Sequence, residues 1–139
     1  MPISEIDGHD ISQYTVLIVA DISLNTILLQ KFLSQFTCKV ASANGGQQAL
    51  DIIAENKPAL ILLDIMMPGI DGLMLLQMLR ANPAYADIRI VMVSAANDNE
   101  NVMKALSLGA NDFISKPINL AKFTNCVSTQ LKAYIAGQK

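Results

Sequence analysis

The sequence predicts an α/β fold in which five parallel strands form one doubly wound sheet between two layers of helices. Short apolar runs alternate five times with segments of helical periodicity along 139 residues. This alternation is typical of a parallel sheet with right-handed crossover connections. An apolar content of 52% is enough to fill the core of one domain of this length.

Five segments are expected to be strands. Residues 16–20, 60–63 and 88–93 are short apolar runs, broken only by Arg89, which is the pattern of strands buried on both faces. Residues 38–43 ("CKVASA") and 111–115 ("NDFIS") are more polar, as expected for the edges of a sheet. With these two at the edges, the strand order is 2-1-3-4-5. The topological switch point, where such sheets bind ligands, then lies between the first and third strands.

Helical periodicity fills the segments between the strands. Leu24, Leu28, Phe32 and Phe36 recur every four residues, which predicts that they form the buried face of the first helix. Weaker helical patterns cover 46–55, 72–81 and 99–108, with Gly109 as a stop signal, and a last helix is predicted by the stripe Leu120, Phe123, Val127, Leu131, Tyr134 and Ile135.

The predicted domain covers residues 14–136, with a polar N-terminal lead at 1–13 and a short tail at 137–139. No domain with an output activity is recognised beyond residue 136. We therefore expect the output to be a protein contact or to lie in a domain outside this sequence.

Composition excludes several classes of function. The formal net charge is −2, and Lys and Arg are not clustered in any run, so we expect no direct binding to nucleic acid or to an anionic membrane. No apolar run reaches the roughly 18 residues of a membrane span, and the N-terminus lacks the apolar core of a signal peptide, which predicts a cytoplasmic protein. Cys38 and Cys126 form no CxxC pair, so both are interpreted as buried apolar side chains in a reducing compartment.

Polar side chains stand where four of the predicted strands end. Asp21 follows the first strand, Asp64 the third, Ser94 the fourth, and Lys116 the fifth. Because the carboxyl ends of parallel strands meet at one edge of the sheet, these four groups are expected to converge. Carboxylates bind Mg²⁺, Lys and Ser match phosphate oxygens, and a carboxylate is able to become an aspartyl-phosphate.

Three motifs carry a resemblance to a known family. The segments "DIMMPGIDG" (64–72), "VSAA" (93–96) and "SKP" (115–117), in this order and spacing, resemble the receiver domain of bacterial two-component response regulators. The similarity covers about residues 14–136. It implies a flavodoxin-like (βα)5 fold and a signalling role that is not enzymatic beyond slow autodephosphorylation.

The resemblance also implies the chemistry of the site. Asp64 would accept a phosphoryl group from a histidine kinase or a phosphotransfer protein, and Lys116 would pair with the phosphoryl oxygens. Mg²⁺ would be held by Asp21, Asp64 and the backbone carbonyl of Met66.

The same resemblance assigns a switch. The Ser94 hydroxyl would move toward the phosphoryl group, and Phe113 would follow it inward. The Lys116–Pro117 peptide bond would be cis. Signalling would pass through the surface of residues 99–136 to an unknown downstream protein, with a homodimer as a further possibility.

Ala20 departs from the family pattern, which usually has two adjacent acids after the first strand. We expect weakened Mg²⁺ binding with phosphorylation retained, because loss of an outer-shell group costs about 10–100-fold in metal affinity or activity. The alternative is a pseudo-receiver, an interaction module with weakened or no phosphorylation. A flavin carrier is disfavoured because "DISLNT" (21–26) contains no glycine, and a phosphatase because no second acid stands two residues after Asp21 or Asp64.

Overall fold

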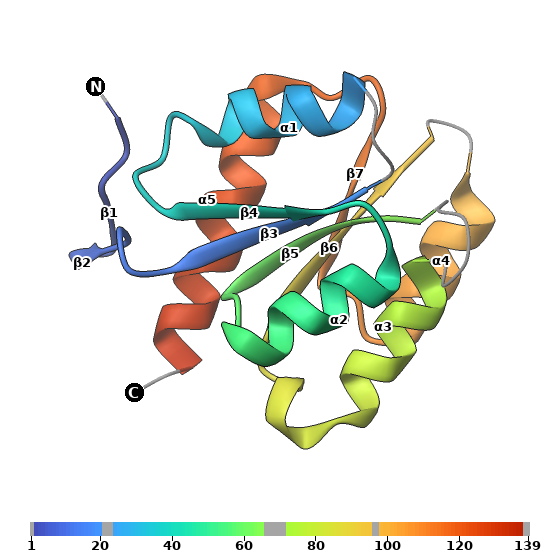
Figure 1. The fold of residues 1–139 in the computed structure, drawn as a ribbon. Helices are drawn as coiled ribbons and strands as arrows, with labels where there is room; N and C mark the ends of the chain where they lie inside the picture. The colour runs from blue at the N-terminus through green and yellow to red at the C-terminus, as the bar shows by residue number, and fades with distance from the viewer. Residues whose placement is uncertain (1, 21–23, 66–71, 96–97, 138–139) are drawn as a thin grey trace.

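A computed structural model of the chain describes residues 2–20, 24–65, 72–95 and 98–137 and confirms the predicted α/β fold (Figure 1). The central sheet has five strands, each close to its predicted position. They are β3 (Thr15–Val19), β4 (Lys39–Ala43), β5 (Leu60–Asp64), β6 (Arg89–Ser94) and β7 (Asp112–Ser115).

The order of the strands in the sheet is β4-β3-β5-β6-β7, the predicted 2-1-3-4-5 arrangement. Every neighbouring pair is parallel. All residues of β3 and β5 are buried, whereas the edge strands β4 and β7 each expose part of their side chains. The apolar composition of the central strands therefore sets their position, because only a strand with neighbours and helices on both faces excludes water from every side chain.

Helices cover both faces of the sheet (Figure 1). Buried side chains of α1 and α5 belong to one apolar cluster, and those of α2, α3 and α4 belong to a second cluster on the opposite face. The bounds are α1 (Leu24–Leu33), α2 (Gly46–Glu55), α3 (Gly72–Ala81), α4 (Asn99–Ser107) and α5 (Leu120–Gly137), with a short 3-10 helix η1 (Pro83–Tyr85) before β6.

The buried face of α1 differs from the predicted one. The predicted Leu24 is not among the side chains of α1 that the structure describes. Of the side chains that are described, Leu29 and Leu33 are fully buried. Phe32 is half-buried and turns toward α5, where its ring meets that of Phe123 edge-on at 5.5 Å. Phe36 is also buried, but it lies beyond the end of α1. Because α1 is apolar on two sides, the four-residue spacing alone could not identify which side faces the sheet.

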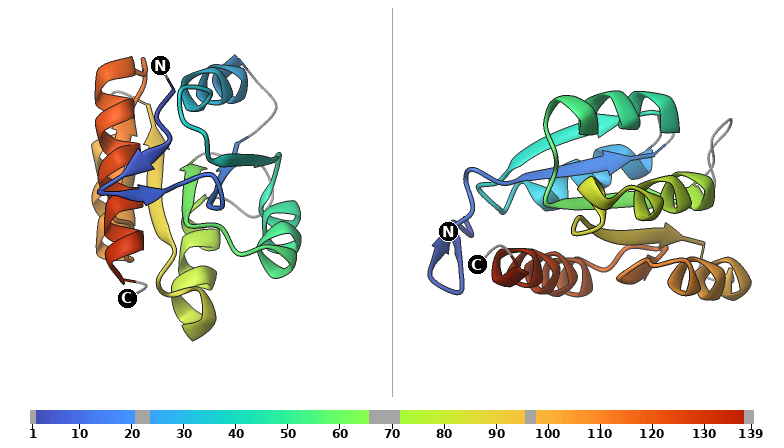
Figure 2. Two further views of the ribbon diagram at one scale, coloured as in Figure 1. Left: turned by 90° about the vertical axis from the view of Figure 1, so that its left-hand side faces the viewer. Right: turned by 90° about the horizontal axis from the view of Figure 1, so that it is seen from below.

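The N-terminal lead packs against the domain as a small hairpin. Strands β1 (Glu5–Ile6) and β2 (His9–Asp10) are antiparallel and are joined by the turn Asp7–Gly8, whose φ angles of 55° and 80° suit an Asp-Gly pair. Ile6 and Ile11 are buried in the same apolar cluster as α1 and α5. The hairpin lies beside α5 (Figure 2), so apolar side chains within the polar lead extend the core.

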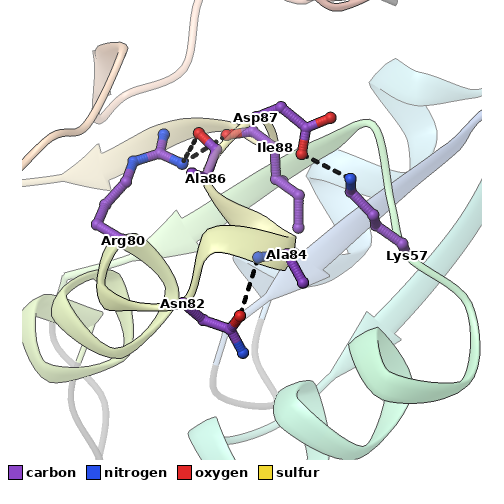
Figure 3. A network of polar contacts seen from close by, with 7 residues as sticks. All are labelled: Lys57, Arg80, Asn82, Ala84, Ala86, Asp87 and Ile88. Carbon is purple, nitrogen blue, oxygen red and sulfur yellow. Dashed lines mark hydrogen bonds and ion pairs between the residues drawn. The ribbon is translucent and has the colours of Figure 1, made fainter.

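A hydrogen-bonded network fixes the end of the sheet at which β6 and β7 begin, and Figure 3 shows the part of it in which Arg80 bonds the carbonyls of Ala86 and Ile88. The Arg80 guanidinium donates to the carbonyls of Ala86 at 3.1 Å, Ile88 at 2.8 Å and Gly109 at 2.9 Å. It also donates to Oδ1 of Asn111 at 2.9 Å. These bonds tie α3 to the segments that lead into β6 and β7, at the edge opposite the carboxyl ends of the strands.

Candidate functional site

The carboxyl ends of the strands form one edge of the sheet, as expected for parallel strands. In the pairing of β5 with β6, Asp64 lies opposite Val93, so Ser94 is one residue further along the neighbouring strand. Ser94 in turn pairs with Ser115 of β7, and the Lys116 N–H donates to the Ser94 carbonyl at 2.8 Å. The register therefore brings Asp64, Ser94 and Lys116 to adjacent positions on three consecutive strands.

Asp64 and Lys116 form an ion pair across this edge. The Lys116 Nζ lies 3.6 Å from Oδ2 of Asp64. The Asp64 side chain is 11% exposed and the Lys116 side chain 29%. A carboxylate at the end of an otherwise apolar strand is costly to bury unless a partner compensates its charge, and Lys116 supplies a compensating cation.

Ser94 carries an unsatisfied hydroxyl. The residue is 2% exposed, and within the described parts of the chain its Oγ has no hydrogen-bond partner. Leaving a buried hydroxyl unpaired costs about 1–3 kcal/mol, so such groups in native proteins often serve a function. This hydroxyl is free to bond a ligand that enters at the carboxyl edge.

Strand β7 and the residues that follow it contain two further groups to which the resemblance assigns a role. The Lys116–Pro117 peptide bond is cis, the isomer that the resemblance implies. Phe113 is 40% exposed on the edge strand, with its N–H bonded to its neighbour Asp112 at 2.8 Å. In this structure the aromatic side chain therefore lies at the surface and is not part of the core.

Gly72 is a site residue that the sequence reasoning missed. A Cβ built on Gly72 would overlap the carbonyl oxygen of Asp64 and would lie 2.9 Å from the Cα of Ile65. The Gly72 N–H also donates to the Ile65 carbonyl at 3.1 Å. The first turn of α3 thus packs directly on the backbone of Asp64, which only a residue without a side chain allows. In the sequence, the only signal at this position is the Asp-Gly pair at 71–72, which is typical of a turn and does not by itself indicate a site residue.

Two of the expected metal ligands, Asp21 and Met66, lie outside the described residues. Ala20 is described: it is 3% exposed, and its N–H bonds to the Ala43 carbonyl at 3.1 Å. Because Val19 pairs with Leu63, Ala20 stands beside Asp64 on the neighbouring strand. Among the residues that the structure describes, no three His, Cys, Asp or Glu side chains cluster closely enough to hold a metal ion. Of the three expected Mg²⁺ ligands, only the carboxylate of Asp64 belongs to the residues that the structure describes.

A cleft of about 590 Å³ opens between β7 and α5, beside the candidate site. Cys126 lines it, and its Sγ donates to Oδ2 of Asp112 at 3.7 Å. Burial, reinforced by the charge of Asp112 and by this bond, raises the pKa of the Cys126 thiol to about 12 from its ordinary 9.0. The thiol is therefore protonated at neutral pH and is a poor nucleophile, in keeping with its interpretation as a buried apolar group.

Because the pKa of Cys126 is raised, we expect the domain to lose stability at alkaline pH. We expect Cys126→Ser to remove this loss. Above pH 9 the unfolded chain releases the thiol proton while the folded chain, with a pKa of about 12, retains it. The folded state then binds more protons, so the free energy of unfolding falls as pH rises. Urea titrations from pH 7 upward should show a steeper decline above pH 9 for the wild type than for Cys126→Ser. Parallel curves would contradict the prediction.

The family model described as "Response regulator receiver domain" matches residues 16–128. The chain is 35% identical over 108 residues to the probable chemotaxis protein CheY of Rhizobium etli, covering 77% of this chain and 84% of the relative. It is 36% identical over 104 residues to the response regulator PleD of Caulobacter vibrioides, covering 75% of this chain and 23% of PleD.

Solved structures of response regulators also superpose on this chain. A putative response regulator from Chloroflexus aurantiacus superposes with a TM-score of 0.81 at 30% identity, covering 86% of this chain and 98% of that one. The receiver domain of NtrX from Brucella abortus has a TM-score of 0.79 at 28% identity, covering 84% of this chain and 98% of that domain. The chain spans less than half the length of the first curated relatives it matches, 23% to 48% of each.

Proposed function

The chain belongs to the receiver domains of response regulators, and from this premise we propose that it accepts a phosphoryl group on Asp64. The observation that carries the proposal is the ion pair of Asp64 with Lys116, 3.6 Å apart, beside the unpaired hydroxyl of Ser94. The donor is a phosphohistidine of a histidine kinase or phosphotransfer protein. The Asp64 carboxylate forms a new P–O bond, the P–N bond to the donor breaks, and the released imidazole takes up a proton.

The groups around Asp64 suit an aspartyl-phosphate. Once the carboxylate is phosphorylated to the acyl phosphate, Lys116 is placed to pair with a phosphoryl oxygen, since a cation already lies beside that position. The Ser94 hydroxyl supplies a hydrogen-bond donor on the adjacent strand. Each interaction lowers the energy of the charge that develops on the transferring group.

We assign the Mg²⁺ site to Asp21, Asp64 and the backbone carbonyl of Met66. Two carboxylates and a carbonyl are the hard oxygen ligands that Mg²⁺ prefers, and Asp64 presents its carboxylate at the carboxyl edge of the sheet with 11% of the side chain exposed. The bound ion would neutralise the negative charge between the carboxylates and the incoming phosphoryl group. The chain's own contribution is to fix Asp64 at the end of a fully buried strand.

The output would pass through α4, β7 and α5. Movement of the Ser94 hydroxyl toward the phosphoryl group would shift the start of α4, and Phe113, now 40% exposed, would turn inward from the same region. The Lys116 N–H bond to the Ser94 carbonyl couples the two strands at this point. A downstream protein, or a second copy of the chain, would recognise the altered surface.

We further propose that the protein is cytoplasmic and that it signals without enzymatic turnover. No helix in the described parts of the chain combines the length and apolar character needed to cross a bilayer. Some relatives bear the names of enzymes, such as the probable cyclic di-GMP phosphodiesterase of Vibrio cholerae, but this chain covers only 28% of that protein. The matched segment is the receiver domain.

The second candidate function, a pseudo-receiver that signals by contact alone, is favoured by Ala20. Ala20 puts a methyl group beside Asp64 where the family usually has an acid. Intact mass measurement after incubation with acetyl phosphate and Mg²⁺ separates the two candidates. A gain of one phosphate supports the phosphoacceptor, and an unchanged mass at every Mg²⁺ concentration supports the pseudo-receiver.

Ala20→Asp is expected to lower the Mg²⁺ concentration needed for half-maximal phosphorylation by about tenfold or more. The added carboxylate supplies the missing outer-shell group, although it also adds a like charge beside Asp64, which opposes part of the gain. Titration of Mg²⁺ against acetyl-phosphate-driven modification measures the shift. Ala20→Asn is the matched control of similar size and no charge, and superimposable curves for wild type and Ala20→Asp would refute the expectation.

A further inference from the structure

The strand that leads to Lys116 is short and lies at the edge of the sheet. Strand β7 has four residues, and of these only Ile114 is buried. A slip of one residue would put Phe113 in the place of Ile114, and both side chains are apolar. The pattern of apolar side chains in β7 therefore does not by itself fix the register of this strand against β6.

The register of β7 decides where Lys116 lies. In the observed pairing Ser115 is opposite Ser94, and the next residue, Lys116, has its Nζ 3.6 Å from Oδ2 of Asp64. A slip of one residue would move Lys116 by about 3.3 Å along the strand and would turn its side chain to the other face of the sheet. A displacement of this size would separate Lys116 from Asp64.

Asn111 bonds β6 directly before β7 begins. Its backbone N–H donates to the Ile90 carbonyl at 2.8 Å, and its side-chain Oδ1 accepts the Ile90 N–H at 2.7 Å. A side-chain oxygen thus serves as an acceptor at the start of a ladder of backbone bonds. Ile90 is fully buried, so a slip of β7 would remove the acceptor of a buried N–H, which is unfavourable. The two bonds therefore hold Asn111 opposite one residue of β6.

Arg80 of α3 holds the Asn111 side chain in this position. Its Nη2 donates to the same Oδ1 at 2.9 Å, and its Nε donates to the Gly109 carbonyl at 2.9 Å. Gly109 has a φ angle of 112°, and a Cβ on it would lie 3.0 Å from Cγ of Arg80, so the arginine packs closely on this turn. Arg80 is itself anchored by its bonds to the carbonyls of Ala86 and Ile88. Helix α3 therefore helps to fix the point at which β7 starts.

We propose that Asn111 is a positioning residue: its side chain, oriented by Arg80, fixes the register of β7 and thereby places Lys116 Nζ beside Asp64. Asn111 acts through the strand, from the end of β7 opposite to Lys116, and not on the phosphoryl group itself. The proposal rests on the proposed phosphoacceptor function, since the phosphoryl group is what Lys116 would serve.

Zero-length cross-linking with a water-soluble carbodiimide tests the placement of Lys116 without phosphorylation. The reagent joins a carboxylate to an amine that lies beside it, here Asp64 to Lys116, and peptide mapping by mass spectrometry measures the yield. Asn111→Ala should lower this yield about fivefold or more, because the strand is then free to slip. The ion pair of Lys57 with Asp87, 2.6 Å apart, is the internal control, and its yield should change less than about twofold.

Asn111→Asp is the matched rescue variant. A carboxylate of the same shape still accepts the Ile90 N–H and still pairs with Arg80, so the yield of the Asp64–Lys116 cross-link should return to that of the wild type. Thermal unfolding verifies that the variants remain folded. If Asn111→Ala does not, Asn111→Ser takes its place, because the serine hydroxyl is too short to reach both donors.

The rate of phosphorylation by acetyl phosphate and Mg²⁺ tests whether this placement serves the reaction. Asn111→Ala should lower the rate about 10- to 100-fold, because misplacing one group at the reacting centre has an effect of this size. In a Lys116→Met background the same substitution should change the residual rate less than about twofold, because its effect passes through Lys116. A merely structural role would lower the rate by the same factor in both backgrounds.

Three results would overturn the proposal. They are an Asp64–Lys116 cross-link as abundant in Asn111→Ala as in the wild type, a loss that Asn111→Asp does not restore, or equal losses of rate in the two backgrounds. A wild-type chain that takes up no phosphate would refute the proposed phosphoacceptor function. The cross-linking result would still decide whether Asn111 places Lys116, so the two hypotheses fail separately.

Discussion

Asp64→Asn is expected to abolish the uptake of phosphate from acetyl phosphate in the presence of Mg²⁺. The substitution keeps the size and hydrogen-bonding shape of the side chain but removes the anionic oxygen that would form the P–O bond. It also leaves Lys116 Nζ, now 3.6 Å from Oδ2, without its carboxylate partner. Intact mass spectrometry should show one added phosphate on the wild type and none on the variant, a loss of essentially all the signal.

Asp51→Asn is the matched control for this experiment. Asp51 is exposed on α2, where it accepts a bond from Gln47 at 3.1 Å, so its neutralisation should leave phosphorylation unchanged. Thermal unfolding of both variants verifies that they remain folded. Retention of the added phosphate in Asp64→Asn would place the phosphoacceptor elsewhere and would remove the basis of the proposed function.

Gly72→Ala is expected to destabilise the domain by about 3 kcal/mol, the upper part of the range for overpacking a well-packed site. Replacing a glycine within a helix by alanine normally stabilises the helix by about 1 kcal/mol, so the predicted sign is the reverse of the usual one. The reason is that the new methyl group would overlap the Asp64 carbonyl oxygen, and both contacting atoms belong to the backbone. Urea titration of the free energy of unfolding measures the effect.

The same substitution should slow phosphorylation of the variant at temperatures where it remains folded, because relief of the overlap must displace the backbone of Asp64. Gly137→Ala is the control, since a Cβ at Gly137 meets no atom within 4 Å and should be neutral or slightly stabilising. A Gly72→Ala protein as stable and as readily phosphorylated as the wild type would show that α3 does not position Asp64.

Much of the fold was predictable because its signals are local. The largely apolar runs of β3, β5 and β6 identified the central strands, and the more polar "CKVASA" and "NDFIS" segments identified the edges. Helix α3 begins and ends at the predicted residues. These predictions hold because burial on both faces requires apolar side chains throughout a strand.

The N-terminal hairpin and the orientation of α1 were not predictable in the same way. Ile6 and Ile11 stand among acids and polar residues, so no apolar period marks them as core. Their burial depends on the surface that α5 provides, a helix more than one hundred residues further along the chain. The buried side of α1 likewise depends on the position of Phe123 in α5.

By itself, the sequence determined the order of strands and helices and the residue types at the carboxyl ends of the strands, since both follow from the patterning of neighbouring side chains. Only the tertiary structure decided that Lys116 Nζ reaches Asp64, that the Ser94 hydroxyl is buried without a partner in the described chain, and that Gly72 packs on the Asp64 backbone. These relations depend on the register of the strands and on the position of α3 against the sheet. Both are fixed by the packing of segments far apart in the chain.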